Sequence, residues 1–322
     1  MHEIGGYFEM ELPARRDWHP GATALNSGRN ALRWFLRLRR VHTLWLPHYI
    51  CDSVIAAARA EGVVLRFYHL DADWWPQADL PDGEGEWLLF VNYFGMLDGH
   101  VQTLAGAGNL LVDNAQAFFA TGIDAPAIYS PRKFFGVADG GYLVDPEGPT
   151  APLPADRSWD RYAAALIRVE APAEEGYRAY LRKEEGIGAL PLRAMSELTG
   201  RLLGGVDYDR ARFLRDRNFR ALHEMLEPLN RLTIDPEAVN GPLAYPLLCG
   251  REDLRRLLAR QRIYVPTYWA EVGERVPADS REAELARCLS PLPVDQRYDL
   301  DDMRRIANAV TALVETPAAE PV

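Results

Sequence analysis

The chain has 322 residues, of which 48% are hydrophobic and 25% charged, as in ordinary soluble globular proteins that bury a large core. Acidic residues outnumber basic ones by 46 to 36, which argues against a nucleic-acid or anionic-membrane partner. Three widely spaced cysteines predict neither a disulfide framework nor a CxxC site, and the seven histidines show no metal-binding spacing. Neither a signal segment nor a long apolar run is evident, so a cytoplasmic location is expected.

The first half of the chain alternates short apolar runs with helical patterns, which predicts a three-layer α/β domain. The runs are nearly continuous rather than alternating, as expected for strands covered on both faces of a mostly parallel sheet. Ligands of such sheets bind beyond the carboxyl ends of the strands. The predicted strands are 43–46, 63–68, 87–91, 109–112, 127–130 and 141–144, with a helix at 52–60.

A proline-rich surface connection at 145–154 ends this regular alternation, and helical patterns then dominate. Helices are predicted at 158–167, 173–185, 194–203, about 207–226, 251–262 and 299–314. From 243 onward strand and helix patterns return, which indicates a small α+β domain. The predicted division is a large domain at 1–208 and a small one at 209–322. The proline-rich tail after Val314 is expected to fray.

The chain contains only two lysines, Lys133 and Lys183. Unlike arginine, a shielded lysine can lose its proton and form a Schiff base with an aldehyde cofactor. Lys133 lies among aromatic and small residues, whereas Lys183 lies in a charged stretch predicted to be a solvated helix face. Lys133 is therefore the candidate for chemistry, with a chance survivor of arginine-biased composition as the alternative.

Three further motifs accompany Lys133 in chain order. The Ser27-Gly28-Arg29 turn precedes an amphipathic helix and forms either an anion site or an N-cap without a ligand. Asp113 ends a buried strand, where it either keeps a heterocyclic nitrogen protonated or caps a loop. The Asp139-Gly140-Gly141 turn allows close backbone approach, as many ordinary turns do.

Taken together, the order of these motifs resembles the nucleotide-sugar aminotransferase (DegT/StrS) family of fold-type-I enzymes that use pyridoxal 5′-phosphate (PLP). The resemblance implies a large domain with a mostly parallel sheet and a small C-terminal α+β domain, and it covers almost the whole chain. The supporting motifs are Ser27-Gly28-x-x-Ala31-Leu32, Leu46-Pro47-His48-Tyr49, Asn92-Tyr93-Phe94-Gly95, Asp113-x-Ala115-Gln116, Lys133 before Asp139-Gly140-Gly141, Met195-Ser196-Glu197-Leu198, Ile263-Tyr264-Val265 and Leu289-Ser290-Pro291-Leu292-Pro293.

By this resemblance Lys133 forms the internal aldimine with PLP and shuttles protons at the substrate carbon. Asp113 pairs with the pyridine nitrogen, and Gln116 bonds the phenolic oxygen. Ala115 packs under the ring. The resemblance implies that the phosphate is held by Ser27, Gly28, Arg29 and Ser130.

The sequence departs from the family pattern at several of these positions. Cys51 stands where an aromatic residue commonly stacks on the PLP ring, and Tyr49 is a candidate to replace it. Arg193 stands one residue away from the usual arginine that reaches the partner subunit's phosphate. Ile128 and Ser130 replace the usual serine and histidine. The candidate substrate contacts are Tyr264, Tyr268, Trp269 and Arg193.

The activity implied is transfer of an amino group from a donor such as L-glutamate, through PLP, to a keto sugar linked to a nucleotide. Family members are homodimers with active sites at the subunit interface, so a homodimer is expected, with no nucleic acid, membrane or metal. Two alternatives remain open. One is a PLP-dependent sugar dehydratase, although that minority carries histidine in place of Lys133. The other is a non-catalytic relative, with or without PLP, that serves as a scaffold or regulator.

Overall fold

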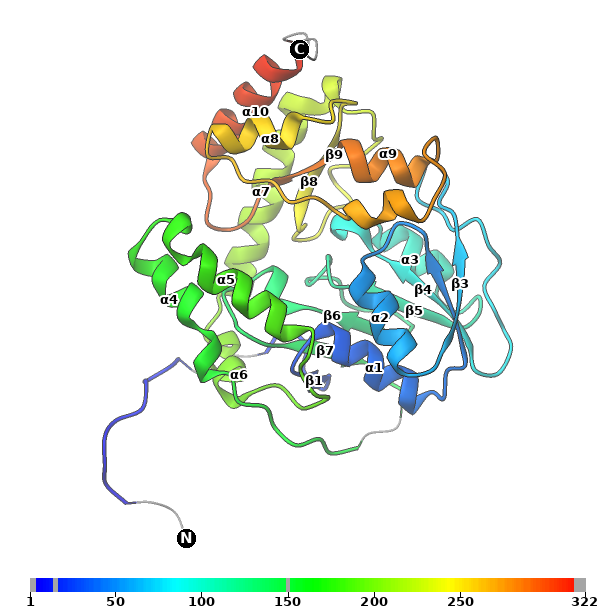
Figure 1. Cartoon of the computed structure of the whole chain (residues 1–322), viewed down its shortest axis with the longest axis vertical. Coiled ribbons are helices and arrows are strands. Elements are labelled where there is room, and N and C mark those ends of the chain that lie inside the picture. Colours follow the sequence, from blue (N-terminus) through cyan, green and yellow to red (C-terminus); the bar gives the residue numbers. More distant parts are fainter. Residues whose placement is uncertain (1–3, 14–16, 149–150, 316–322) are drawn as a thin grey trace.

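The computed structural model describes residues 4–13, 17–148 and 151–315, and its first half is built on a seven-stranded sheet (Figure 1). The strand order is β1-β7-β6-β5-β4-β2-β3. Strands β2 to β6 pair in parallel, and β7 runs antiparallel to both β6 and β1. The strands are β1 (Thr23–Leu25), β2 (Thr43–Pro47), β3 (Val64–Tyr68), β4 (Glu86–Val91), β5 (Leu110–Asn114), β6 (Ala127–Tyr129) and β7 (Gly141–Val144).

This sheet confirms the predicted mostly parallel α/β architecture. Strand β5 lies between β4 and β6 and is buried along its whole length. Burial of both faces explains its continuous apolar run. Strand β1 was not predicted, since three residues are too short for a periodic pattern. The flanking helices are α1 (Gly28–Leu38), α2 (Asp52–Ala60) and α3 (Asp98–Leu104), and α1 packs on β6 and β7.

Four helices follow the sheet in the chain. The predicted helix at 158–167 is instead a 3₁₀ turn (Trp159–Arg161) and then α4 (Ala163–Glu170). Helix α5 (Ala173–Ile187) extends two residues beyond its prediction. Helix α6 (Glu197–Gly204) begins later than predicted because the Ser196 side chain caps it by accepting from Thr199 N at 3.2 Å. Helix α7 (Tyr208–Leu226) leads into the C-terminal part.

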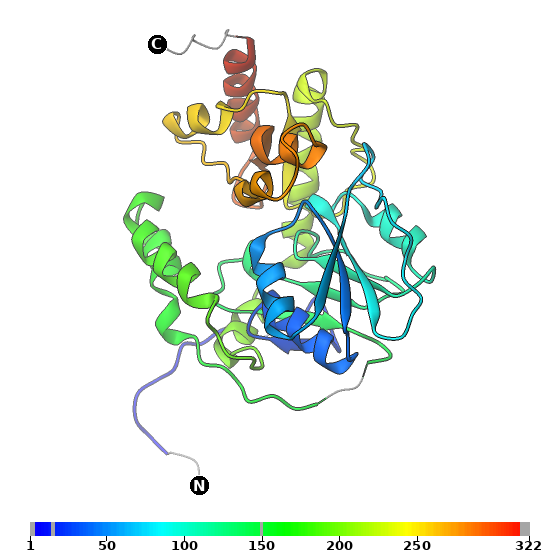
Figure 2. The ribbon, with the colours of Figure 1, turned by 45° about the vertical axis from the view of Figure 1, so that its right-hand side comes forward.

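The C-terminal part lies above the sheet in Figure 2 and contains a two-stranded antiparallel sheet, β8 (Ala244–Leu248) with β9 (Leu289–Pro293). It adds α8 (Leu254–Arg260), α9 (Arg281–Cys288) and α10 (Leu300–Glu315). The small α+β arrangement was predicted, but α9 was missed. A second apolar cluster joins α7, α8 and α10 through residues such as Phe219, Leu254 and Ile306.

Two sequence-based expectations lie partly or wholly outside the described residues: part of the connection at 145–154, and the tail from residue 316 onward. No helix in the described part of the chain is long and apolar enough to cross a membrane.

Candidate active site

Asp113 lies at the carboxyl end of the central strand β5 and is only 7% exposed. Its Oδ1 accepts a hydrogen bond from the Ala115 N–H at 2.8 Å. Burial raises the pKa of Asp113, and the charge of Lys133 opposes that rise, as does the Ala115 N–H. The carboxylate and the lysine thus lie within electrostatic reach, as expected for two groups that follow neighbouring strands β5 and β6.

Lys133 ends a 3₁₀ turn, η2 (Pro131–Lys133), directly after β6. Its side chain is exposed in the single chain, whereas the next residue, Phe134, is buried. The shielded surroundings inferred from neighbouring residue types are therefore not formed within one chain.

Lys183, in contrast to Lys133, is more buried than the sequence predicted. Its predicted place on a solvated helix face was wrong. Its side chain is 16% exposed, and its ammonium lies 3.1 Å from Glu184 and 5.1 Å from the centre of the Tyr180 ring. Burial lowers the pKa of Lys183, and Glu184 opposes that shift. A charged local sequence therefore did not reveal that this part of α5 packs against Arg132.

The N-terminus of α1 meets the end of β6. Ser27 caps α1, with its Oγ accepting from Asn30 N at 3.0 Å. A Cβ on Gly28 would lie 3.4 Å from Ser130 Cβ, so the two residues are in contact. A Cβ on Gly141 would lie 2.3 Å from the Ser27 carbonyl carbon, so only glycine allows β7 to pass there. Two segments far apart in sequence thus combine at the positive end of a helix dipole.

We call the place where Ser27 and Gly28 at the start of α1 meet Ser130 the α1 corner, and Arg29 adds positive charge to it. Burial lowers the pKa of Arg29, and the charge of Arg132 lowers it further. The Nε atoms of both arginines are buried without a hydrogen-bond partner among the described residues. Arg132 also pairs with Glu184 of α5 at 2.6 Å. Arg132 precedes Lys133 directly, but sequence reasoning missed it because only the tertiary structure brings Arg29 near.

Gln116 is 1% exposed, and its Oε1 accepts from the Phe94 N–H at 2.9 Å. Its Nε2 is buried without a hydrogen-bond partner in the described chain. An unpaired buried amide donor is costly, so such a group points to a partner outside the chain. Ala115 beside it is half-buried.

Tyr49 is fully buried, and its hydroxyl donates to the Tyr268 carbonyl. The Tyr49 ring lies 5.0 Å from that of Trp269. Two of the four predicted substrate contacts, Tyr268 and Trp269, therefore join Tyr49 in one aromatic cluster. The pKa of Tyr268 is raised to about 12, mainly by burial and to a smaller extent by the charge of Tyr180 in α5. Cys51 precedes α2, is half-buried, and raises the pKa of Arg29, which places it beside the α1 corner.

Two predicted substrate contacts lie elsewhere. Tyr264 is 53% exposed and donates to Glu174 of α5 at 2.8 Å. Arg193 is half-buried, and its carbonyl accepts from the Asn26 N–H at 3.1 Å, beside the α1 corner of its own chain.

Asp139 has a role that its sequence motif did not reveal. It is fully buried, and its carboxylate accepts from the Ser196 N–H at 2.9 Å, from the Ser196 hydroxyl at 2.8 Å and from the Thr199 hydroxyl. The acidic-Gly-Gly turn and the Met-Ser-Glu motif therefore form one unit, which anchors the start of α6 to the turn that pairs with Ser27.

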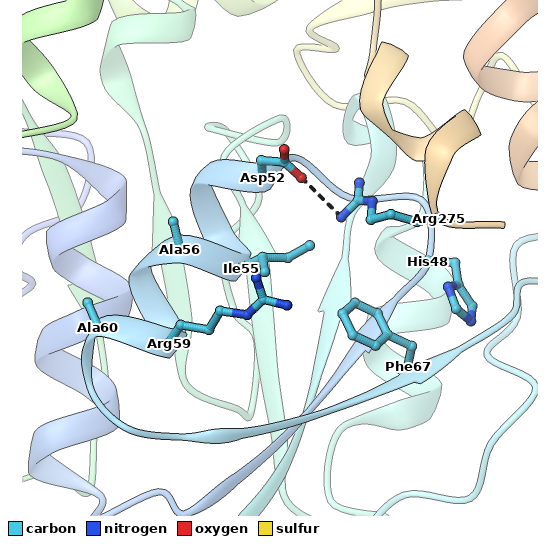
Figure 3. A pocket seen from close by; sticks show the side chains of 8 residues that line it. All are labelled: His48, Asp52, Ile55, Ala56, Arg59, Ala60, Phe67 and Arg275. Atoms are coloured by element: carbon cyan, nitrogen blue, oxygen red, sulfur yellow. Dashed lines mark ion pairs between the residues drawn. The ribbon is translucent and has the colours of Figure 1, made fainter.

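A separate open cavity of about 930 Å³ lies between α2 and the C-terminal part (Figure 3). His48 and Phe67 stack at its edge with ring centres 5.3 Å apart, and Arg275 pairs with Asp52 at 3.3 Å. None of the predicted cofactor contacts lines this cavity, although Cys51 adjoins Asp52. Its lining residues are His48, Asp52, Ile55, Ala56, Arg59, Ala60, Phe67 and Arg275.

The seven-stranded, mostly parallel sheet with its flanking helices and the small antiparallel sheet have the arrangement known as aminotransferase fold type I. More particularly, the chain is similar to solved sugar aminotransferases. A DegT/DnrJ/EryC1/StrS aminotransferase from Brucella abortus is 15% identical over 92% of this chain and 86% of that one, with a TM-score of 0.61. The PLP form of a sugar aminotransferase from Streptococcus pneumoniae is 14% identical over 92% and 87%, with a TM-score of 0.61.

A third structure, DesI in the presence of its TDP-sugar product, is 18% identical over 91% of this chain and 80% of that one, with a TM-score of 0.65. No protein-family model matches the sequence. No curated protein matches it either. The likeness therefore confirms the fold implied by the sequence motifs.

Proposed function

We propose that the protein is a PLP-dependent aminotransferase that acts on a sugar. The observation that carries the proposal is the buried Asp113 carboxylate at the end of β5, within electrostatic reach of Lys133. PLP needs an amine for its aldehyde and a counter-ion for its ring nitrogen. Lys133, one of only two lysines in the chain, supplies the amine, and Asp113 supplies the counter-ion.

The described residues fit PLP at both of its ends. Gln116 offers an unpaired buried N–H near the ring position. At the other end, the capped N-terminus of α1, Ser130 beside Gly28, and Arg29 form an anion site. The unpaired Nε atoms of Arg29 and Arg132 leave this corner short of hydrogen-bond acceptors, which phosphate oxygens supply.

Bound PLP supplies an aldehyde that takes up amines and a ring that withdraws electrons from the attached carbon. Lys133 Nζ would be the amine that holds PLP, and it would move a proton at the substrate carbon. Asp113 would hold a proton on the ring nitrogen, and Gln116 Nε2 would donate to the phenolic oxygen. Ala115 would be a further contact of the ring. Tyr49, which packs on Trp269, and Cys51, which interacts with Arg29, are the proposed contacts for the other face of the ring.

The proposed acceptor is a keto sugar linked to a nucleotide, with an amino acid such as L-glutamate as donor. The support is the similarity to DesI, whose structure was determined with its TDP-sugar product. Tyr268 and Trp269 are the proposed substrate contacts nearest the site, because they pack with Tyr49. Tyr264 and Arg193 lie away from this aromatic cluster and are proposed to contact more distant parts of the substrate.

We further propose a homodimer. Helices α4 and α5 project beside the sheet in Figures 1 and 2. Large apolar side chains are exposed on both helices. Leu166, Val169 and Tyr177 are 61%, 84% and 56% exposed. Exposed apolar side chains on neighbouring helices are typical of association surfaces. We propose that the second copy also shields Lys133, which is exposed in the single chain.

The domain division at 208/209 and a cytoplasmic location remain predictions. The second apolar cluster, which begins at Phe219, supports a small C-terminal unit. Other buried residues of that part, such as Leu248 and Leu285, instead pack with the core of the first half. Limited proteolysis tests the division, because cleavage near residue 208 would release two stable fragments.

The direct test is the visible absorbance of the purified protein mixed with PLP. A yellow band is expected for the wild type and for Lys183→Ala, and its loss is expected for Lys133→Ala. No band at saturating PLP would overturn the proposal and favour a cofactor-free scaffold. If PLP binds, a screen of nucleotide keto sugars with L-glutamate follows. Amino transfer supports the proposal, while water loss without amino transfer would assign the protein to the sugar dehydratases.

A further inference from the structure

Arg215 of α7 carries a positive charge in a place that is 1% exposed. Its Nε donates to Gln296 Oε1 at 2.8 Å, and its guanidinium lies 4.6 Å from the centre of the Phe134 ring. Burial lowers the pKa of Arg215 to about 10, against the charges of Asp295 and Asp216. It is still a cation at neutral pH. Burying a charge without a bidentate carboxylate is costly, so its contacts require an explanation.

One set of contacts leads to the catalytic lysine's turn. The Phe134 carbonyl accepts two hydrogen bonds, from Arg215 Nη2 at 3.3 Å and from Gln296 Nε2 at 2.9 Å. Phe134 directly follows Lys133, and its own N–H donates to the Pro131 carbonyl at 3.0 Å. Two donors from the C-terminal part therefore hold the end of the turn that presents Lys133.

A second set of contacts leads to Gln116. Arg215 Nη1 donates to the Pro242 carbonyl at 2.9 Å and to the Leu243 carbonyl at 3.4 Å. The Leu243 N–H donates to the Phe94 carbonyl at 2.9 Å. The Phe94 N–H in turn donates to Gln116 Oε1 at 2.9 Å. One guanidinium thus connects the backbone beside Lys133 with the backbone that orients the Gln116 amide.

We infer that Arg215 and Gln296 are positioning residues, which set Lys133 relative to Gln116 by clamping the Phe134 carbonyl to the C-terminal part of the chain. The inference rests on the proposed function for the role of Lys133. A planar guanidinium can donate in several fixed directions at once, which a lysine ammonium cannot match. The charge alone is therefore insufficient, and the fork geometry is the property that matters.

The two lysines make a direct test possible. The protein is mixed with an equimolar amount of PLP, reduced with sodium borohydride and digested, and the pyridoxyl label at Lys133 is measured by mass spectrometry relative to that at Lys183. The variants are Arg215→Lys, which keeps the charge, and Gln296→Ala. The matched control is Arg212→Met, since Arg212 lies on the same helix but is 42% exposed and 3.8 Å from Asp209.

We expect about a tenfold fall in the Lys133-to-Lys183 ratio for Arg215→Lys, since a hydrogen bond to a charged group contributes roughly one factor of ten or more. Gln296→Ala is expected to lower the ratio less, and Arg212→Met is expected to leave it unchanged. Circular dichroism identifies any variant that does not fold, and Gln296→Ala replaces no charge. Folded Arg215→Lys and Gln296→Ala proteins with the wild-type ratio would overturn the inference.

A second measurement separates this inference from the proposed function. Acetylation by N-acetoxysuccinimide without PLP reports the reactivity of the Lys133 amine against that of Lys183. If the wild type takes no PLP at Lys133, the proposed function fails, and the acetylation ratio still tests the clamp. A change of that ratio in Arg215→Lys supports the clamp, and an unchanged ratio in both variants overturns it.

Discussion

Replacing Asp113 by asparagine is expected to leave PLP bound but to slow amino transfer severely. The substitution keeps the size of the side chain and an oxygen that can accept from the Ala115 N–H. It removes the negative charge that would hold a proton on the ring nitrogen. PLP is expected to remain attached, because the substitution leaves Lys133 and the α1 corner unchanged.

The magnitude follows from the burial of this carboxylate. An opposite charge in direct contact moves a pKa by about 1 to 3 units, and each unit corresponds to about 1.4 kcal/mol. Asp113 is 7% exposed, so solvent screens the contact little and the upper part of this range applies. The variant is therefore expected to lose about 100- to 1000-fold in kcat.

The assay is single-turnover conversion of bound PLP by L-glutamate, followed by absorbance. Asp98→Asn is the matched control, because burial raises the pKa of Asp98 as well, while its carboxylate accepts from Asn92 at 2.7 Å. The control is expected to react like the wild type. A turnover of Asp113→Asn within about threefold of wild type would refute the assignment of Asp113 as the ring's counter-ion.

In the protein without PLP, the effect of Asp113→Asn on folding stability is expected to be neutral or favourable. Because the folded state raises the pKa of Asp113 above its ordinary 3.8, folding favours the protonated form. Its contribution to stability is therefore lost as pH rises from 3.8 through the raised value. At neutral pH, Asp113→Asn without PLP is expected to be at least as stable as wild type in urea denaturation. A clear destabilisation would show that the carboxylate has a structural role.

Three further predictions concern other parts of the chain. Burial lowers the pKa of His19 from 6.5 to about 4. About 3 kcal/mol of unfolding free energy should therefore be lost as the pH falls from 6.5 to below 4. His19→Phe should flatten this pH dependence of stability, measured by denaturant titration. Gly141→Ala should destabilise by roughly 3 kcal/mol or more, measured by thermal unfolding, because its Cβ would meet the Ser27 backbone at 2.3 Å; a wild-type Tm would contradict this. Leu166→Asp with Val169→Asp should yield monomers in sedimentation, and an unchanged dimer would place the interface elsewhere.

The sequence predicted most of the sheet, because continuous apolar strands and their flanking helices are local patterns. The helix at 52–60 and the strand at 141–144 agree with the structure at both ends. The differences from the prediction also have local causes, since β1 is only three residues long and Ser196 delays the start of α6. Helix α9 was not predicted either.

The chemistry proposed for the candidate site was predicted from residue type and chain order. A lone strand-end aspartate, a scarce lysine and a glycine turn before a helix are sequence properties. Their order resembles that of the DegT/StrS family, and this resemblance led to the prediction of PLP. The sequence could not show that Lys183 is more shielded than Lys133, or that Glu184 meets Arg132. It could not show that Asp139 anchors α6, nor that Arg215 links the Phe134 carbonyl to Gln116. These facts depend on segments 50 or more residues apart, whose contacts exist only after the two parts of the chain pack together.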